Sequence, residues 1–173
     1  MPNYRRAFIP GGTWFFTVNL LDRGSSLLTE NITRLGDAIR DTQTRFPFTI
    51  DAMVVLPDHL HAVLTLPEDD PDFSTRWRLI KTRFSKTIPA TELINASRHA
   101  RAERAIWQRR YWEHCIRDER DRDRHIDYCY INPVKHGLVA EVEDWPHSTF
   151  HRDVRRGYWL SLRDIDGDFG ETR

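Results

Sequence analysis

Apolar residues along this chain follow two spacings in turn, and each change of spacing marks a predicted element. In some stretches the residues alternate or form short runs rich in aromatic and β-branched types, which is typical of strands. In others apolar residues return every three or four positions, which is typical of amphipathic helices. In chain order these stretches predict a strand at 13–20, a helix at 31–45, strands at 48–56 and 59–66, a helix at 74–88, a strand at 106–116 and a helix at 118–131.

Prolines and glycines separate these stretches. Pro57 and Asp58 predict a tight turn that joins two strands as a hairpin, and Pro89 ends the second helix. Pro133 with His136 and Gly137 is expected to close the last helix. Residues 90–105 are polar and rich in arginine without a clear period, so they are interpreted as an insertion.

The order of these elements predicts the fold class. Strand, helix, strand, strand, helix, strand is the split βαβ order of a ferredoxin-like sheet. We therefore predict an α+β fold with a ferredoxin-like (RRM-like) antiparallel sheet, helices on one side and an added C-terminal helix. The first and third strands are expected to be central in that sheet.

Two histidines interrupt the apolar strand at 59–66. Successive side chains of a strand point to opposite faces, so His59 and His61 share one face while Leu60 points to the other. Two neighbouring imidazoles on one face suit a divalent metal ion. A half-exposed pair on an edge strand is the usual explanation of such a spacing, but the apolar residues around this pair favour burial, where an unpaired imidazole is costly.

A second candidate group lies near the end of the last predicted helix. Residues four apart share a helical face, so Tyr128 and Asn132 point together and Tyr130 points away. Tyr128 is the better candidate nucleophile, although the ordinary pKa of its hydroxyl is about 10 and attack needs help with the proton. The Asn132 carbonyl oxygen is a suitable ligand for Mg²⁺ or Mn²⁺. Alternatively, both tyrosines only pack and Asn132 only ends the helix.

Composition limits the class of protein. The chain has 173 residues, a formal net charge of zero and two cysteines, which together favour a single domain without a disulfide framework. We predict one domain at 1–160 and an acidic tail at 161–173. The N-terminus lacks a signal-peptide pattern and no run is long enough to span a membrane, so we predict a cytoplasmic location and no membrane association. Arginine and lysine nevertheless cluster locally, which indicates basic surfaces on a neutral chain.

These motifs match a known family. His59-Leu60-His61 resembles the HUH motif, and Tyr128 with Asn132 resembles the catalytic helix of single-tyrosine HUH transposases. Over residues 4–156 the chain is similar to the REP-associated tyrosine transposases. The matching strings, in order, are YRR at 4–6, GGTWFFT at 11–17, VVLPDH at 54–59, WQ at 107–108, YWEH at 111–114 and YINPVK at 130–135.

The resemblance implies a mechanism and a substrate. It implies that His59, His61 and Asn132 hold Mg²⁺ or Mn²⁺, and that Tyr128 attacks single-stranded DNA to give a 5′-phosphotyrosine and a free 3′-OH. The substrates would be hairpins of repetitive extragenic palindromes, and the enzyme would be a nucleoid-associated monomer or homodimer. The DNA-binding residues implied are Tyr4, Arg5 and Arg6 at the N-terminus and Arg76, Arg78, Lys81 and Arg83 on the second helix.

Two other functions compete with this interpretation. An RRM-like sheet with exposed aromatic residues binds nucleic acid without catalysis and needs no metal at the histidines. A rolling-circle or relaxase-type nickase shares the HUH chemistry but usually carries further domains. The acidic residues Asp164, Asp166, Asp168 and Glu171 also suggest that the tail folds over the basic surface and competes with DNA, or that it is only a loose, solvated end.

Overall fold

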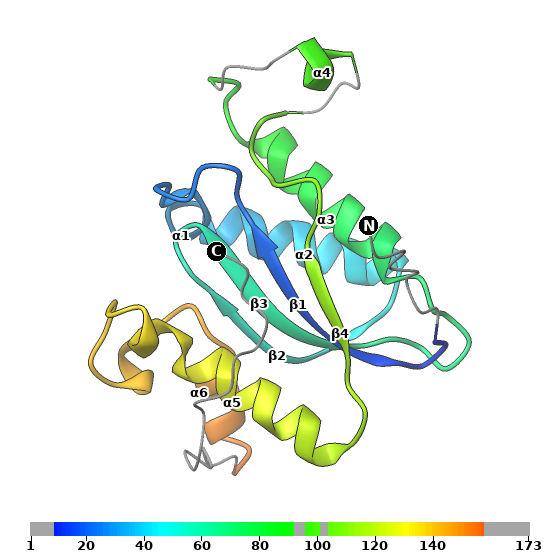
Figure 1. The fold of residues 1–173 in the computed structure, drawn as a ribbon, viewed down its shortest axis with the longest axis vertical. Helices are drawn as coiled ribbons and strands as arrows, with labels where there is room; N and C mark the ends of the chain where they lie inside the picture. The colour runs from blue at the N-terminus through cyan, green and yellow to red at the C-terminus, as the bar shows by residue number, and fades with distance from the viewer. Residues whose placement is uncertain (1–8, 92–95, 101–103, 158–173) are drawn as a thin grey trace, which may run out of the picture.

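An antiparallel sheet of four strands forms the centre of the protein (Figure 1). The computed structural model describes residues 9–91, 96–100 and 104–157. The strand order is β2-β3-β1-β4, so the first and third strands are central and the predicted α+β, ferredoxin-like class is confirmed. The strands are β1 (Thr13–Asn19), β2 (Thr49–Val55), β3 (His59–Thr65) and β4 (Trp112–Cys115).

The register of β3 fixes both histidines in the middle of the sheet. β3 pairs with β1 so that Thr17 lies opposite His61 and Asn19 opposite His59. On its other side β3 pairs with β2 through the predicted hairpin, in which the Leu56 amide donates to the His59 carbonyl at 2.8 Å. A strand that is paired on both sides is held rigidly, which suits a metal site.

Helices cover both faces of the sheet, as Figure 1 shows for α2, α3 and α5. α2 (Ile32–Arg45) and α3 (Phe73–Thr87) pack on one face with Phe16, Leu60 and Leu64 of the sheet. α5 (Glu119–Lys135) packs on the other face with Phe15, Val54 and Val63. Because side chains alternate along a strand, one face holds the larger apolar core and the other holds the histidines and α5.

Shorter elements complete the chain. They are α1 (Leu27–Glu30), α4 (Ala96–His99) within the predicted insertion, the 3₁₀ turn η1 (Val142–Asp144) and α6 (Phe150–Val154). The segment before α6 runs along the free edge of β2, where the Val55 amide donates to the His147 carbonyl at 2.8 Å. The outer strand β2 is therefore partly covered. The predicted tail at 161–173 lies outside the described residues, and the division into domains stays a prediction.

The fourth strand is shorter than predicted. Residues 106–116 were expected to form one strand, but only Trp112–Cys115 pairs with β1 as a ladder. Trp107 makes a separate bridge to Leu20, and its ring packs against Phe84 of α3. Tyr111 lies between these two pairing points and packs against Phe16 and Trp77. The aromatic residues that suggested a continuous strand therefore fill the core across an interruption.

α5 runs four residues beyond its predicted end at 131, and of the residues expected to close it, His136 and Gly137 do so while Pro133 does not. The helix continues through it to Lys135, at the cost of one backbone hydrogen bond, because proline has no N–H to donate. The end is made by Gly137, whose φ of 68° is a left-handed conformation that glycine adopts easily. The Gly137 amide donates to the Val134 carbonyl at 2.9 Å and the Leu138 amide to the Pro133 carbonyl at 2.9 Å. Asn132 therefore lies within the helical segment and not at its end, so the helix fixes the direction of its side chain.

Candidate active site

His59 and His61 lie side by side on the face of the sheet that α5 covers. Both are buried, and their ring centroids are 5.0 Å apart. Leu60 points into the opposite core, as the alternation of side chains predicts. The histidines therefore share a protected face.

Each histidine is oriented by a hydrogen bond at Nδ1. His59 Nδ1 lies 2.7 Å from Asp58 Oδ1, and His61 Nδ1 lies 2.9 Å from Thr17 Oγ1. Such bonds leave Nε2 as the ligand atom and fix the direction in which it points. Burial, together with the neighbouring His61, lowers the pKa of His59 to about 4 despite the opposing effect of Asp58. At neutral pH His59 is thus the uncharged imidazole that metal ligation requires.

Asn132 adds a carbonyl oxygen to this face. The residue is 1% exposed, and Asn132 Oδ1 has no hydrogen-bond partner among the described residues. Burying a carbonyl oxygen without a hydrogen-bond partner destabilises the fold by about 1–3 kcal/mol, and a bound cation would remove that cost. Two imidazoles and one amide oxygen are a donor set that fits a divalent ion of the Mg²⁺ or Mn²⁺ kind.

Tyr128 lies against the histidines, one helical turn before Asn132. Its ring centroid is 5.2 Å from that of His61 and 5.8 Å from that of Phe15. The Lys135 ammonium lies over the same ring, 5.0 Å from its centroid. Tyr128 is only 2% exposed, so a phosphodiester can reach its hydroxyl only when neighbouring groups move.

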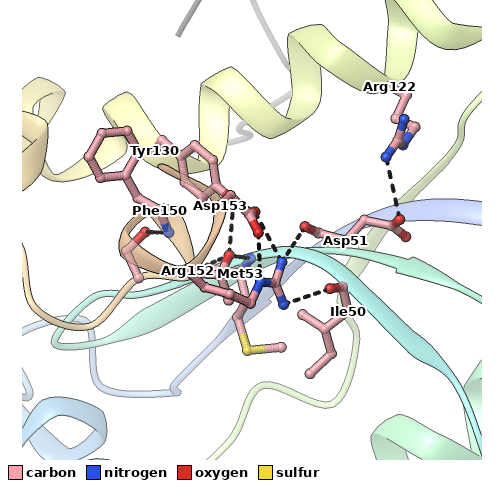
Figure 2. Close-up of polar contacts among 10 residues, drawn as sticks. Ile50, Asp51, Met53, Arg122, Tyr130, Phe150, Arg152 and Asp153 are labelled. Carbon is pink, nitrogen blue, oxygen red and sulfur yellow. Dashed lines mark hydrogen bonds and ion pairs between the residues drawn. The ribbon is translucent and has the colours of Figure 1, made fainter. Parts of the chain in front are cut away.

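Tyr130 is held on another side of α5, as the helical spacing predicts. Figure 2 shows its hydroxyl directed at Asp153 of α6, to which it donates a hydrogen bond, and Thr149 Oγ1 lies 3.1 Å from the same oxygen. Burial and the Asp153 carboxylate raise the pKa of Tyr130 far above its usual value. Arg152 in turn donates to the Ile50 and Asp51 carbonyls of β2 at 3.0 and 2.8 Å. Tyr130 is therefore part of a structural network.

Comparison with known proteins decides the family. No family model matches the chain. A REP-associated tyrosine transposase of Escherichia coli strain K12 is 53% identical over 159 residues, which is 92% of this chain and 88% of the relative. The chain belongs to the REP-associated tyrosine transposases. A Haemophilus influenzae protein that carries the same family name is 47% identical over 156 residues, or 90% of this chain and 89% of the relative.

A solved structure supports the same assignment. It is that of a REP-associated tyrosine transposase bound to a REP hairpin, and it matches with a TM-score of 0.84 and 49% identity. The match covers 100% of this chain and 98% of the solved one. The transposase interpretation is therefore confirmed over the RRM-like binder and the rolling-circle nickase. Within the described residues the transposase has no helix long and apolar enough to cross a membrane.

Arg76 of the transposase is not available to DNA, which corrects one predicted contact. It is 1% exposed, and its guanidinium donates to the carbonyl oxygens of Pro47 and Asp72 and to the Asp70 carboxylate. An arginine so enclosed fixes the start of α3 to the neighbouring loops and cannot contact a phosphate. The prediction treated every arginine of the helix as part of an exposed basic face.

The other predicted DNA contacts differ in their surroundings. Lys81 donates to the Gln108 carbonyl at 2.9 Å and lies over the ring of Tyr111, and Arg83 donates to Thr42 Oγ1 at 3.1 Å. Arg78 is exposed on α3, on the sheet face opposite the histidines. Tyr4, Arg5 and Arg6 lie outside the described residues. Arg78, Lys81 and Arg83, with those three, stay predictions.

A second group of ionisable side chains was missed from the sequence. His114 of β4 lies 2.9 Å from Asp121 Oδ2, and His125 Nδ1 lies 2.7 Å from the Asp121 carbonyl. The ligand atoms of these three residues lie within 4.8 Å of one another, which makes them a possible metal-binding group. The spacing of four between Asp121 and His125 was the available signal. Family membership and this group together indicate that the transposase uses a divalent metal.

A cavity opens beside His59. It has a volume of about 280 Å³, and its walls include the loop at 23–26, Asp58, His59 and His136. The ring of His136 lies 5.2 Å from that of His59, centroid to centroid. The end of α5 thus places Lys135 against Tyr128 and His136 against His59. Neither contact was predicted from the sequence.

Proposed function

We propose that this transposase cuts and rejoins single-stranded DNA at REP hairpins, with Tyr128 as nucleophile and a Mg²⁺ or Mn²⁺ ion held by His59, His61 and Asn132. The observation that carries the proposal is the contact between the Tyr128 ring and His61, 5.2 Å between centroids. It brings the only tyrosine on that face of α5 to a pair of imidazoles whose Nδ1 atoms are already engaged. The relative solved with a REP hairpin supports this class of substrate.

The protein's residues account for most of the chemistry. When bound, the divalent ion polarises the phosphodiester and balances the charge that develops on it. Thr17 and Asp58 fix the orientation of the two imidazoles that would hold the ion. Tyr128 Oη attacks the phosphorus and its proton passes to solvent, while the bond from phosphorus to the 3′ oxygen breaks and that oxygen takes a proton from water. The products are a 5′-phosphotyrosine and a free 3′-OH, which can attack back.

A pair of tyrosine variants tests the proposal. Tyr128→Phe and Tyr130→Phe each remove one buried hydroxyl from the same helix, so they serve as matched controls for each other. We expect Tyr128→Phe to abolish the covalent protein–DNA adduct on a labelled REP hairpin with Mn²⁺, and Tyr130→Phe to retain it. An adduct that persists in Tyr128→Phe and disappears in Tyr130→Phe would overturn the assignment.

The metal part of the proposal has its own test. His59→Ala and His61→Ala should each eliminate cleavage while hairpin binding changes little, because the ion acts on the reacting phosphate rather than on the hairpin stem. Cleavage by wild type in EDTA at the rate seen with Mn²⁺ would refute a catalytic ion. The cytoplasmic, nucleoid-associated location and the monomeric or homodimeric state remain predictions.

A further inference from the structure

Lys135 occupies an unusual position at the end of α5. It lies two helical turns after Tyr128, and its side chain folds back so that Nζ is 5.0 Å from the centroid of the tyrosine ring. Lys135 is exposed whereas Tyr128 is buried. No ion pair joins Lys135 to a carboxylate among the described residues. Its ammonium is therefore an exposed positive charge beside the candidate nucleophile.

A lysine in the last turn of a helix has ordinary structural roles. Lysine there interacts favourably with the helix dipole and with the last carbonyls. In α5 those carbonyls already accept from the amides of His136, Gly137 and Leu138. The dipole accounts for a lysine at this position, and a cation–π contact accounts for its lying over an aromatic ring. Neither explanation uses the fact that this ring belongs to the candidate nucleophile.

The charge change during tyrosine attack gives an ammonium at this position a further role. A phosphodiester carries one negative charge, and the five-coordinate transition state carries more on its equatorial oxygens. A cation placed beside those oxygens stabilises the transition state more than the ground state. Lysine is suited to this task because its ammonium is a compact charge with three donors on a flexible stem.

We propose that Lys135 is a further catalytic residue, which binds a non-bridging oxygen of the phosphate that Tyr128 attacks. The inference rests on the proposed function. As the bond between Tyr128 Oη and phosphorus forms and the bond to the 3′ oxygen breaks, the Lys135 side chain donates to the same non-bridging oxygen throughout. The contact persists in the 5′-phosphotyrosine, so Lys135 assists the return attack of a 3′-OH equally. Tyr128 still releases its proton to solvent, and the 3′ oxygen takes one from water.

The experiment compares Lys135→Ala with Lys86→Ala, which removes the same charge from an exposed position on α3. Single-turnover adduct formation is measured on a labelled REP hairpin with Mn²⁺, and hairpin affinity is measured separately in a Tyr128→Phe background. We expect Lys135→Ala to slow adduct formation by on the order of 100-fold and to weaken binding only a few-fold. Lys86→Ala should change neither rate nor affinity more than about twofold.

Chemical rescue separates a direct charge contact from a structural effect. Propylammonium has the same atoms that Lys135→Ala removes and restores the charge, so it should recover adduct formation by about tenfold relative to tetramethylammonium at equal ionic strength. Lys135→Gln, which keeps most of the side chain, should be as slow as the alanine variant. If Lys135→Ala proves unfolded by circular dichroism, the comparison of Lys135→Gln with Lys135→Arg decides, and the arginine variant should retain the faster rate.

The results distinguish this inference from the proposed function. Loss of the adduct in Tyr128→Phe together with wild-type rates in Lys135→Ala and Lys135→Gln would overturn the role of Lys135 and leave Tyr128 in place. Equal losses of rate and of hairpin affinity would also overturn it, because they would make Lys135 a binding contact alone. Failure of wild type to form any adduct through Tyr128 would instead refute the proposed function.

Discussion

Replacing Arg76 by alanine should destabilise the protein strongly without a specific effect on DNA. The guanidinium makes hydrogen bonds to the Pro47 carbonyl at 2.6 and 3.2 Å, to the Asp72 carbonyl at 2.7 Å and to Asp70 Oδ2 at 2.8 Å. Each buried group that loses its partner costs about 1–3 kcal/mol. Asp70 is partly exposed and can return to water, so the two carbonyls dominate and the expected loss is about 3–5 kcal/mol.

Urea unfolding at pH 7 measures this loss, and Arg78→Ala is the matched control. Arg78 is two residues away on the same helix and is exposed, so its removal should change the free energy of unfolding by less than about 0.5 kcal/mol. The interaction with Arg76 also lowers the pKa of Asp70, and Arg76→Ala should release that pKa toward its ordinary value. A stable Arg76→Ala protein with weakened, less salt-dependent hairpin binding would refute the structural role and restore Arg76 as a phosphate contact.

Two further predictions concern the histidines. Burial lowers the pKa of His59 to about 4 from 6.5, so the unfolded chain binds the proton more readily and stability falls as the pH drops from 6.5 toward 4, by at most about 3 kcal/mol. His59→Gln should flatten that slope in urea unfolding, and an unchanged slope would rule His59 out as its source. Thr17→Val removes the 2.9 Å bond that orients His61 and should weaken Mn²⁺ binding by about 10- to 100-fold in calorimetry, whereas wild-type affinity would show that the bond is dispensable.

The strand and helix order could be predicted because local spacing determines it. The alternation around His59 and His61 identified the shared face, and the spacing of four joined Tyr128 with Asn132. These relations need no information from distant residues. The central position of β3 followed from a topology that the order of elements favours strongly.

The errors have tertiary causes. From its spacing along the helix, Arg76 was predicted to lie on an exposed basic face. The loops at Pro47 and Asp70 supply hydrogen-bond acceptors that allow it to be buried instead. The last helix was expected to end at 131, but packing of α5 on the sheet continues it past Pro133 to Lys135, and it then ends at the predicted His136 and Gly137. The spacing of four could have paired Asp121 with His125, but His114 comes from β4, and spacing along α5 cannot reveal that contact.

The alternation along β3 has a consequence for how the sequence can change. Leu60, Ala62 and Leu64 belong to one core, whereas His59, His61 and Val63 face α5. Inserting or deleting one residue in this strand would exchange the two sets. The imidazoles would then point into the apolar core, and the leucines would point to the face that α5 covers. We therefore expect an insertion or deletion in this strand to be tolerated less well than an apolar substitution, since a substitution alters one residue and a shift of register reverses them all.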